Sequence, residues 1–346
     1  MATIHDVARR ARVSASTVSH VVNGTRFVSQ ATRARVEDAI GSLGFRPNAL
    51  ARSLRRGRSH TLGLILPDSA NPFFAEMGRE LETSAFEAGF SVVLCNTEND
   101  REKERLYLNV LVRNQVDGIL LVATGGRSDL FEAFARDELP VVMLDREVSR
   151  PGLDSVISDH FGGGLLATRH LLSLGHRRIA CIAGPARLSS SAQRLAGYRK
   201  ALQDAGVRGV EDLVHHGDFH PEAGWAAARR LLRGARPPTA IFACNDLMAF
   251  GVLRAADELG RSVPEELAVV GYDDIELARY TTPPLSTVAQ PKREMARQAL
   301  RLMTRRIQAV PLPPQKRPLP VSLVVRRTCG GAAAAAPIRK GGEGSA

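Results

Sequence analysis

Polar and aromatic side chains follow the apolar runs in the second part of the sequence, at the places where each run ends. The set combines two acids, two arginines, three amides, a serine and three phenylalanines. Its members are Asn71, Phe73, Phe74, Asp145, Arg146, Ser190, Arg194, Phe219, Asn245, Asp273 and Gln290. Carboxylates and guanidiniums hold hydroxyl groups through directed hydrogen bonds, and aromatic faces stack on the C–H surface of a sugar ring. The set therefore predicts a site for a small neutral polyol, whereas a nucleotide would need a phosphate cradle.

The elements that must position these residues are short strands alternating with helices from Thr61 onward. Predicted strands cover 61–66, 91–96, 118–122, 141–144, 155–157, 178–183, 213–215, 240–243 and 267–271. Predicted helices cover 73–88, 101–114, 162–174, 191–205, 221–232 and 246–259. Fully apolar strands between helices are typical of parallel sheets covered on both faces. The pattern passes through two similar halves, 61–159 and 160–289, before 290–307 crosses back. In such doubly wound sheets a ligand lies at the carboxyl ends of the strands, here in the cleft between the two halves.

Each of these residues also has a structural interpretation. The adjacent phenylalanines open a predicted helix, so either could belong to the core. Asp145 and Arg146 could form a local ion pair. Asn245 could cap the helix that begins at Asp246, which is itself interpreted as mainly structural, and Asp273 could also cap. The specific observation is that all of them fall at strand ends of one fold.

The first sixty residues have a different composition. Residues 2–61 contain eleven arginines, no lysine and three acidic residues, whereas the whole chain has a formal net charge of +11. Apolar residues recur with helical spacing across 4–11, in a second helix opened by Ser14 or Ala15, and across 30–43. Two short helices joined by a tight turn predict a helix-turn-helix, whose second helix enters the DNA major groove. The alternative is a three-helix bundle that binds nothing.

This arrangement predicts which residues face double-stranded DNA. Ala15, Ser16 and His20 project outward near the start of the second helix, and Thr17 and Ser19 are placed to bond phosphate. The full predicted set is Thr3, Ser14, Ala15, Ser16, Thr17, Ser19, His20, Asn23, Arg26, Leu54 and Arg55.

The segment DVARRARVSASTVSHVVNG, followed by RPNALARSLR, resembles the LacI/GalR family of bacterial repressors, and the resemblance continues to about Cys329. It implies an all-α headpiece and a hinge helix, then a periplasmic-binding-protein-like core of two doubly wound parallel sheets. It also implies that the hinge helices of a homodimer enter the minor groove, where Leu54 wedges into the central base step and kinks it. Pyrimidine–purine steps kink most easily, so a CG-centred palindromic operator is expected. The alternative is an ordinary amphipathic helix packed on the core.

The resemblance also bears on the ligand. The strand-end set is similar, position by position, to that of periplasmic ribose-binding proteins. The runs LCNTEND and GYDDIELARYTTPPLSTVAQPK resemble the ribose-operon repressors of the family. The purine-responsive branch is the second resemblance, in the headpiece and in GDFHPEAGW. This sequence departs from the purine-responsive branch at two positions. That branch is expected to have Arg in place of Leu188 and an aromatic residue in place of Arg146. Ribose is therefore preferred, with another sugar or a purine as alternatives. A solute-binding protein with the same core is the alternative outside the repressors, although it would need a signal peptide and no headpiece.

Several classes of protein lack support. There is no GxGxxG, GxxxxGK[ST], GxSxG or HExxH motif, so no enzyme, cofactor or metal site is predicted. The first residues do not form a signal peptide and no apolar run could span a bilayer, so a bacterial cytoplasmic, nucleoid-associated protein without membrane contact is expected. Four dispersed cysteines are expected to be buried thiols.

The predicted domain plan has four parts. They are a headpiece (1–46), a hinge (47–60), a core (61–328) and a disordered tail (329–346). Within the core, one subdomain takes 61–159 and 290–318 and the other takes 160–289 and 319–328. No Leu follows Leu323, so the Leu-rich tetramer helix of some family members is not expected. Sugar binding is expected to rotate one subdomain against the other and alter operator binding, in a direction that the sequence leaves open.

Overall fold

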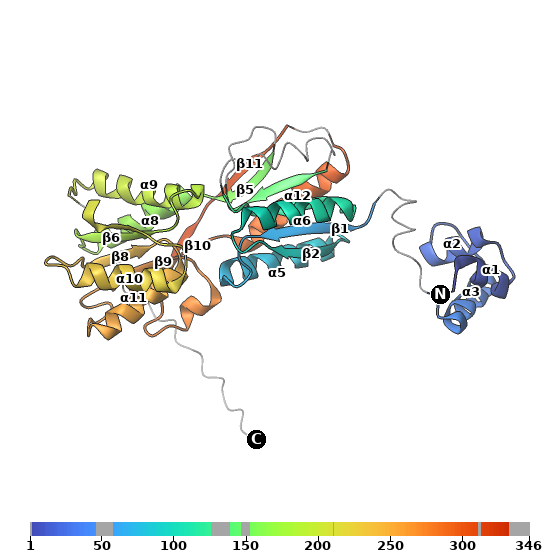
Figure 1. The fold of residues 1–346 in the computed structure, drawn as a ribbon, viewed down its shortest axis with the longest axis horizontal. Helices are drawn as coiled ribbons and strands as arrows, with labels where there is room; N and C mark the ends of the chain where they lie inside the picture. The colour runs from blue at the N-terminus through green and yellow to red at the C-terminus, as the bar shows by residue number, and fades with distance from the viewer. Residues whose placement is uncertain are drawn as a thin grey trace, which may run out of the picture. The chain divides into compact units, whose positions relative to one another are not determined.

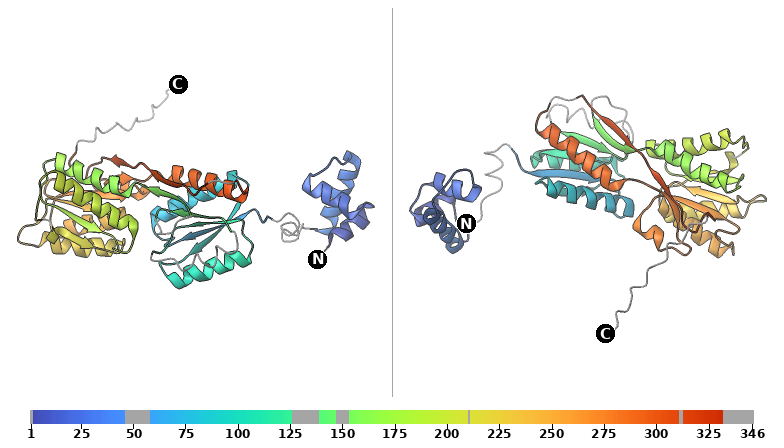
Figure 2. Two further views of the ribbon diagram at one scale, coloured as in Figure 1. Left: turned by 90° about the horizontal axis from the view of Figure 1, so that it is seen from above. Right: turned by 180° about the vertical axis from the view of Figure 1, so that it is seen from behind.

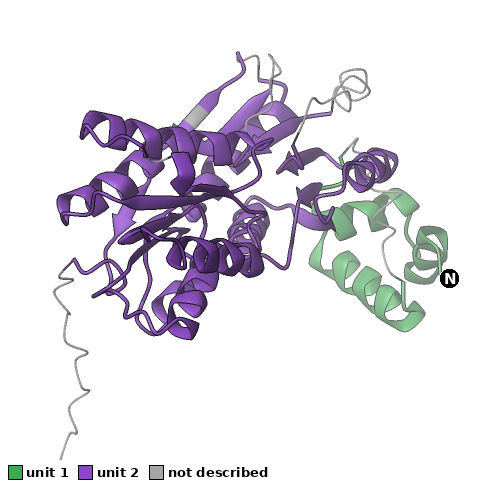
Figure 3. Cartoon of the chain, turned by 60° about the vertical axis from the view of Figure 1, so that its left-hand side comes forward, with its two compact units in different colours: residues 1–60 green, residues 61–346 purple. Residues whose placement is uncertain are grey.

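The computed structural model describes residues 2–45, 58–125, 139–146, 153–209, 211–310 and 313–331, with only the backbone of Arg317. The chain divides into two units, residues 1–60 and 61–346 (Figure 3). Each unit has its own hydrophobic core, and each is described by itself.

The first unit is a bundle of α1 (Ile4–Ala11), α2 (Ala15–Asn23) and α3 (Gln30–Leu43), as the sequence predicts. Each helix begins after a hydroxyl-bearing cap: Thr3, Ser14 and Ser29 accept the backbone N–H of a residue in the first turn. Helix α2 ends at Gly24, whose φ of 62° lies in the left-handed region that glycine adopts without strain. The core is formed by Val7, Ala8, Ala11, Val18, Val21, Val36 and Ala39.

The second unit contains two six-stranded sheets in its described residues. Sheet A has the order β11 (Lys316–Leu319), β5 (Asp154–Ser158), β4 (Val141–Leu144), β3 (Gly118–Leu121), β1 (Thr61–Leu66), β2 (Ser91–Asn96). Sheet B has the order β12 (Ser322–Val324), β10 (Ser286–Ala289), β9 (Ala268–Asp273), β8 (Ala240–Ala243), β6 (Ile179–Ala183), β7 (Val214–His216). All neighbouring strands run parallel except β10 and β12.

Helices cover both faces of each sheet. They are α5 (Pro72–Glu87), α6 (Arg101–Arg113), α8 (His160–Ser173), α9 (Ser189–Asp204), α10 (Pro221–Leu232), α11 (Asp246–Glu258) and α12 (Lys292–Ile307), with short 3-10 turns at Glu211–Leu213 and Glu276–Arg279. Helices α8 and α9 lie together on one face of sheet B, and α10 and α11 lie on the other (Figure 1). None of the described helices is long and apolar enough to cross a bilayer.

Strand β1 shows why the strands are apolar throughout. Leu62, Leu64 and Leu66 share a core with α5 and α12, while Ile65 packs in a second core with α6. Because both faces are covered, no polar residue alternates along the strand, as expected for a parallel sheet.

The chain crosses between the halves three times, at 158–160, 289–292 and 319–322 (Figure 2). We call sheet A with α5, α6 and α12 lobe A, and sheet B with α8 to α11 lobe B. Because β11 and α12 return to lobe A, each lobe is built from separate stretches of sequence.

Within the described residues, the predicted strands and helices are all present, with ends shifted by at most two residues, but three strands were not predicted. Strand β10 reads Ser-Thr-Val-Ala, and β11 contains Lys, Arg and Pro, which only an edge strand accommodates readily. The expected disordered tail from 329 is also corrected at its first residue. Cys329 is 1% exposed. The preceding residue, Thr328, donates through Oγ1 to Val269 O in strand β9 and so holds this segment against sheet B. All four cysteines are free and buried.

Candidate functional site

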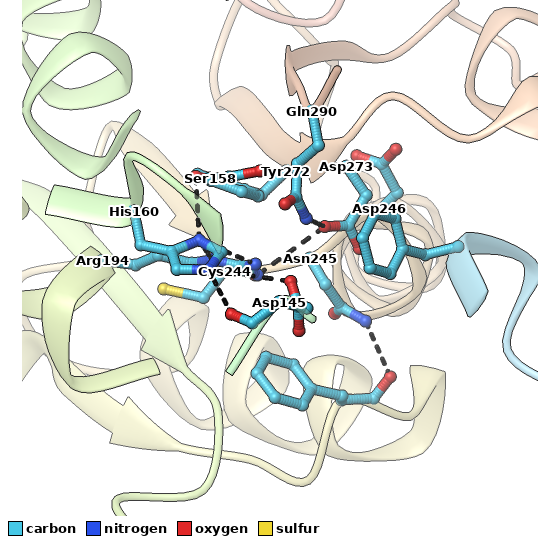
Figure 4. A network of polar contacts seen from close by, with 12 residues as sticks. Asp145, Ser158, His160, Arg194, Cys244, Asn245, Asp246, Tyr272, Asp273 and Gln290 are labelled. Atoms are coloured by element: carbon cyan, nitrogen blue, oxygen red, sulfur yellow. Dashed lines mark hydrogen bonds and ion pairs between the residues drawn. The ribbon is translucent and has the colours of Figure 1, made fainter. Parts of the chain in front are cut away.

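Polar side chains of both lobes and of the crossing between them meet in one network (Figure 4). Ten of the eleven predicted ligand-binding residues are buried, and Phe219 is half-buried. Lobe A contributes Asn71, Phe73, Phe74, Asp145 and Arg146. Lobe B contributes Ser190, Arg194, Phe219, Asn245 and Asp273, while Gln290 lies on the crossing between the lobes.

Three residues of this set adopt a left-handed backbone conformation. The φ angles are 58° at Asp145, 73° at Phe219 and 114° at Asp273. Such conformations cost of order 1–3 kcal/mol each and persist only where the surrounding structure holds them. Backbone strain of this kind is often found at functional sites.

On the side of lobe A, Arg146 is held between main chain and ring. Its Nη1 donates to Ala123 O at 2.7 Å, and its guanidinium lies 5.4 Å from the centroid of Phe74. Burial lowers the pKa of Arg146 to about 10, so it stays protonated at neutral pH. The neighbouring Asp145 Oδ2 is 3.9 Å from Arg146 Nε, which is too long for a hydrogen bond. The local ion pair is therefore weak and leaves both groups with bonding capacity.

On the side of lobe B, Arg194 is fixed by three contacts. Its Nη1 donates to Cys244 O at 2.6 Å and lies 3.7 Å from Asp273 Oδ1, and its guanidinium stacks 3.8 Å from the centroid of Tyr272. Gln290 Nε2 donates to the same Asp273 oxygen at 2.7 Å. Burial raises the pKa of Asp273 to about 7, although Arg194 opposes that rise. The guanidinium of Arg194 and the amide of Gln290 thus both lie beside the buried carboxyl group of Asp273.

The two asparagines of the predicted set cap helices. Asn71 Oδ1 accepts from Phe73 N at the start of α5, and Asn245 Oδ1 accepts from Met248 N in α11. Asn245 Nδ2 also donates to Phe219 O at 2.9 Å. The ring of Phe219 fills the space where a side chain at Gly184 would stand, so only glycine fits there. The capping interpretation of Asn245 is therefore correct, and the same side chain also bonds the backbone carbonyl of Phe219.

Among the strand-end residues and their neighbours in the sequence, several buried polar atoms have no hydrogen-bond partner within the described residues. They are Thr124 Oγ1, Asp145 Oδ1, Arg146 Nε, Ser191 Oγ and Gln290 Oε1. A buried polar group without a partner costs about 1–3 kcal/mol. The group includes donors and acceptors, which suits a neutral molecule carrying several hydroxyls. Among the described residues no His, Cys, Asp and Glu cluster could hold a metal ion.

His160 is a site residue that the sequence analysis missed. Its Nε2 donates to Asp145 O at 2.9 Å, and its Nδ1 accepts from Arg194 Nε at 3.3 Å. Burial and the charge of Arg194 together lower the pKa of His160 to about 4, so the ring is neutral at pH 7. Since His160 follows β5 directly, the strand-end rule could have found it.

Asp246 has a structural role, as the sequence predicts. It is fully buried, and its two carboxylate oxygens accept from Thr287 Oγ1 and from Ile275 N. Burial raises its pKa well above the ordinary value. Its bonds hold the loop after β9 rather than facing the junction of the lobes.

In the headpiece, several of the predicted DNA-facing side chains already have intramolecular partners. Ser14 Oγ caps α2 and lies 2.7 Å from Ser16 Oγ and 2.9 Å from Thr17 Oγ1. Asn23 Nδ2 donates to Ser19 O. The polar side chains of helix α2 and its cap therefore bond to one another or to the main chain. They are Ser14, Ser16, Thr17, Ser19 and Asn23.

The remaining headpiece residues differ in exposure. Thr3 forms a capping box with Asp6, Arg26 is exposed, and His20 Nδ1 is 2.8 Å from Thr25 Oγ1. Ala15 was expected to project outward but is partly buried against the headpiece core, because it opens α2 next to the turn. Leu54 and Arg55, with the hinge helix, lie outside the described residues.

Comparison with known proteins identifies both units. Residues 3–48 match the family model of bacterial regulatory proteins, lacI family, and residues 168–329 match the model of a periplasmic binding protein-like domain. The ribose operon repressor of Escherichia coli (strain K12) is 43% identical over 327 residues, covering 94% of this chain and 99% of that protein. The chain belongs to the LacI family. This LacI-family protein is a DNA-binding transcriptional repressor with a periplasmic-binding-protein-like core, and it is not an enzyme.

Other LacI-family relatives cover most of the chain. The HTH-type transcriptional repressor PurR of Edwardsiella ictaluri is 41% identical over 309 residues, covering 89% of this chain and 91% of that protein. A lac repressor dimer bound to operator and the anti-inducer ONPF has a TM-score of 0.86 at 32% identity, covering 94% of this chain and 98% of that chain. A LacI family transcriptional regulator from Enterococcus faecium with bound ribose has a TM-score of 0.71 at 32% identity, covering 78% of this chain and 98% of that chain.

Proposed function

We propose that this repressor binds a palindromic operator as a homodimer and is controlled by D-ribose, or a closely related sugar, bound between the two lobes. The observation that carries the proposal is the convergence of the strand-end set. The set combines buried acids, arginines and amides with phenylalanines that lie beside the two guanidiniums, and several of its polar atoms have no partner within the described residues. Ring hydroxyls would bond these atoms, and the aromatic faces would stack on the ring carbons.

A purine effector is the second candidate, and it is supported by the PurR relatives. Against it, Leu188 is 2% exposed and closes on Gly125 of lobe A, where a Cβ would lie 2.6 Å from Leu188 Cδ2. An apolar side chain at this position offers a nucleobase no hydrogen bond. The 43% identity to a ribose operon repressor and the ribose-bound relative from Enterococcus faecium favour ribose.

The homodimer is supported by apolar side chains at one edge of sheet A. Strand β2 is the edge strand of the described sheet, and its Val93 and Leu94 are 44% and 55% exposed. Leu106 and Val110 of α6, the next helix along the chain, are also about half exposed. Large apolar residues on an open strand edge favour burial against another chain. A Leu94→Asp substitution should shift the protein from dimer to monomer in sedimentation, and an unchanged mass would contradict the assignment.

We assign four parts to the chain: the headpiece (1–46), the hinge (47–60), the two-subdomain core and the tail. The core is extended from 61–328 to include Cys329 to Gly331, so the tail is 332–346. Ser16, Thr17, Ser19, His20, Asn23 and Arg26 are proposed to face the operator, with Leu54 wedged into a central CG step. The protein would act in the bacterial cytoplasm, at the nucleoid. Sugar in the cleft would favour one arrangement of the lobes and so change the separation of the hinge segments, with a coupling of about 1–3 kcal/mol.

A thermal-shift titration with D-ribose, other pentoses, hexoses, hypoxanthine and guanine tests the effector. A ligand at 100 times its dissociation constant adds about 2.7 kcal/mol to the free energy of unfolding. D-ribose should stabilise the wild type and Asp257→Ala, a control on the exposed end of α11, but not Asp273→Ala. Stabilisation by a purine alone would refute the ribose assignment, and stabilisation of Asp273→Ala by ribose would refute the site.

A further inference from the structure

The loop after β9 is held by two side chains of lobe A. Lys292, the first residue of α12, donates through Nζ to Asp273 O at 3.1 Å and to Asp274 O at 2.8 Å. The same Nζ lies 2.9 Å from Glu76 Oε2 of α5. Glu76 Oε1 in turn accepts from the backbone N–H of Glu276 at 2.8 Å. One ion pair therefore bonds both carbonyls and an amide of the loop 273–276.

The loop needs such support because its backbone is strained. Asp273 and Asp274 have successive φ angles of 114° and 48°, in the region that non-glycine residues rarely occupy. Lobe B contributes a further contact, from Arg326 Nη2 to Asp274 Oδ1 at 2.6 Å. Conformations of this kind persist where several contacts determine them.

The burial of the pair makes these contacts more than a surface ion pair. The side chains of Lys292 and Glu76 are 16% and 17% exposed. Lys292 bonds the main chain of Asp273 rather than its carboxylate. That carboxylate is therefore left to Gln290, to Arg194 and to an effector hydroxyl.

We propose that Glu76 and Lys292 form a clamp between the lobes that positions Asp273 for the effector. This inference rests on the proposed function, because it assigns Asp273 to sugar binding. Glu76 lies one turn after Phe73 and Phe74 in α5, and Lys292 follows Gln290 at a crossing between the lobes. The clamp thus joins effector-facing segments of both lobes. Both members are positioning residues that do not contact the sugar.

The first test needs no ligand. Hydrogen exchange of the full-length protein should show faster exchange of the Glu276 amide in Glu76→Leu, which removes its acceptor, and in Lys292→Met, which removes the charge that fixes Glu76. Lys200→Met is the matched control, since Lys200 is also ion-paired but lies half exposed on α9, paired with Asp204. Wild-type exchange in both clamp variants would overturn the clamp.

The second test measures D-ribose affinity by calorimetry. Lys292→Met and Glu76→Leu should each weaken binding at least tenfold, and the double variant should bind no more weakly than the weaker single variant. Non-additivity of this kind marks two residues that act as one unit, whereas independent destabilisation would give additive losses. Wild-type affinity in Lys292→Met, or additive losses, would overturn the clamp while the sugar site stands. Failure of wild type and Lys200→Met to bind ribose would instead overturn the proposed function, and the exchange measurement would still decide the clamp.

Discussion

Acid should destabilise this protein through His160, which sits between the lobes and is 2% exposed. Burial lowers its pKa from the ordinary value of 6.5 to about 4, with Arg194 acting in the same direction and Asp145 opposing it. In the pH range between these values the imidazole of His160 binds a proton in the unfolded chain but not in the folded protein. The stabilisation is therefore complete above pH 6.5 and is lost as the pH falls toward 4. Each pKa unit corresponds to about 1.4 kcal/mol, so about 2 kcal/mol should be lost between pH 7 and pH 5.

Urea unfolding at pH 7 and pH 5 measures this loss, with fluorescence of Trp225, the single tryptophan, as the probe. His160→Asn is the comparison, because Asn keeps a donor for Asp145 O and an acceptor for Arg194 but does not titrate. The carboxyl groups are the same in both proteins and contribute equally to the loss of unfolding free energy between the two pH values. The wild type should therefore lose about 2 kcal/mol more than the variant between the two pH values. Equal losses would show that His160 is not held neutral in the folded core and would refute the reasoning.

Three further outcomes are expected. Asp273→Asn should raise the melting temperature of the ligand-free protein by a few degrees at pH 7. Burial raises the pKa of Asp273 to about 7, so the folded protein loses stability relative to the unfolded chain as the pH rises from 3.8 toward 7. A lower melting temperature for the variant in a calorimetric scan would contradict this. Arg194→Lys should weaken D-ribose binding at least tenfold in calorimetry, since Lys cannot both stack on Tyr272 and bond Cys244 O, and unchanged affinity would remove Arg194 from the site. Leu54→Ala should weaken operator binding about tenfold in a fluorescence anisotropy titration, in line with the loss of an apolar wedge, and equal affinity would refute the wedge.

Local signals predicted the headpiece well. The caps of its helices are hydroxyl residues, and Gly24 marks the end of α2, so the boundaries can be read from neighbouring residues alone. The convergence of several strand-end residues was also predictable, because carboxyl ends of parallel strands share one edge of a sheet. That rule needs only the order of apolar runs, and it predicted together residues as far apart as Arg194 and Gln290, which both lie beside Asp273.

What the sequence did not predict depends on contacts between distant segments. Strand β11 becomes a strand only because β5 offers it an open edge. Nothing near Phe219 in the sequence indicates its positive φ, and its carbonyl is bonded by Asn245, which is 26 positions away. The ion pair of Glu76 and Lys292 joins residues more than two hundred positions apart, and it has no local signature.

The order in which a ribosome makes this chain has a consequence for its biogenesis. Lobe A begins with β1 at Thr61 but receives α12 and β11 only after all of α8 to β10 have been translated. At 5–20 residues per second, β5 waits roughly 10–30 s for β11, with the α12 side of its sheet uncovered. During that interval the nascent lobe presents apolar surface suited to chaperone binding. The headpiece, complete by residue 45, can fold well before this interval begins. Truncated products of interrupted translation would therefore carry a folded DNA-facing domain without the lobes proposed to regulate it.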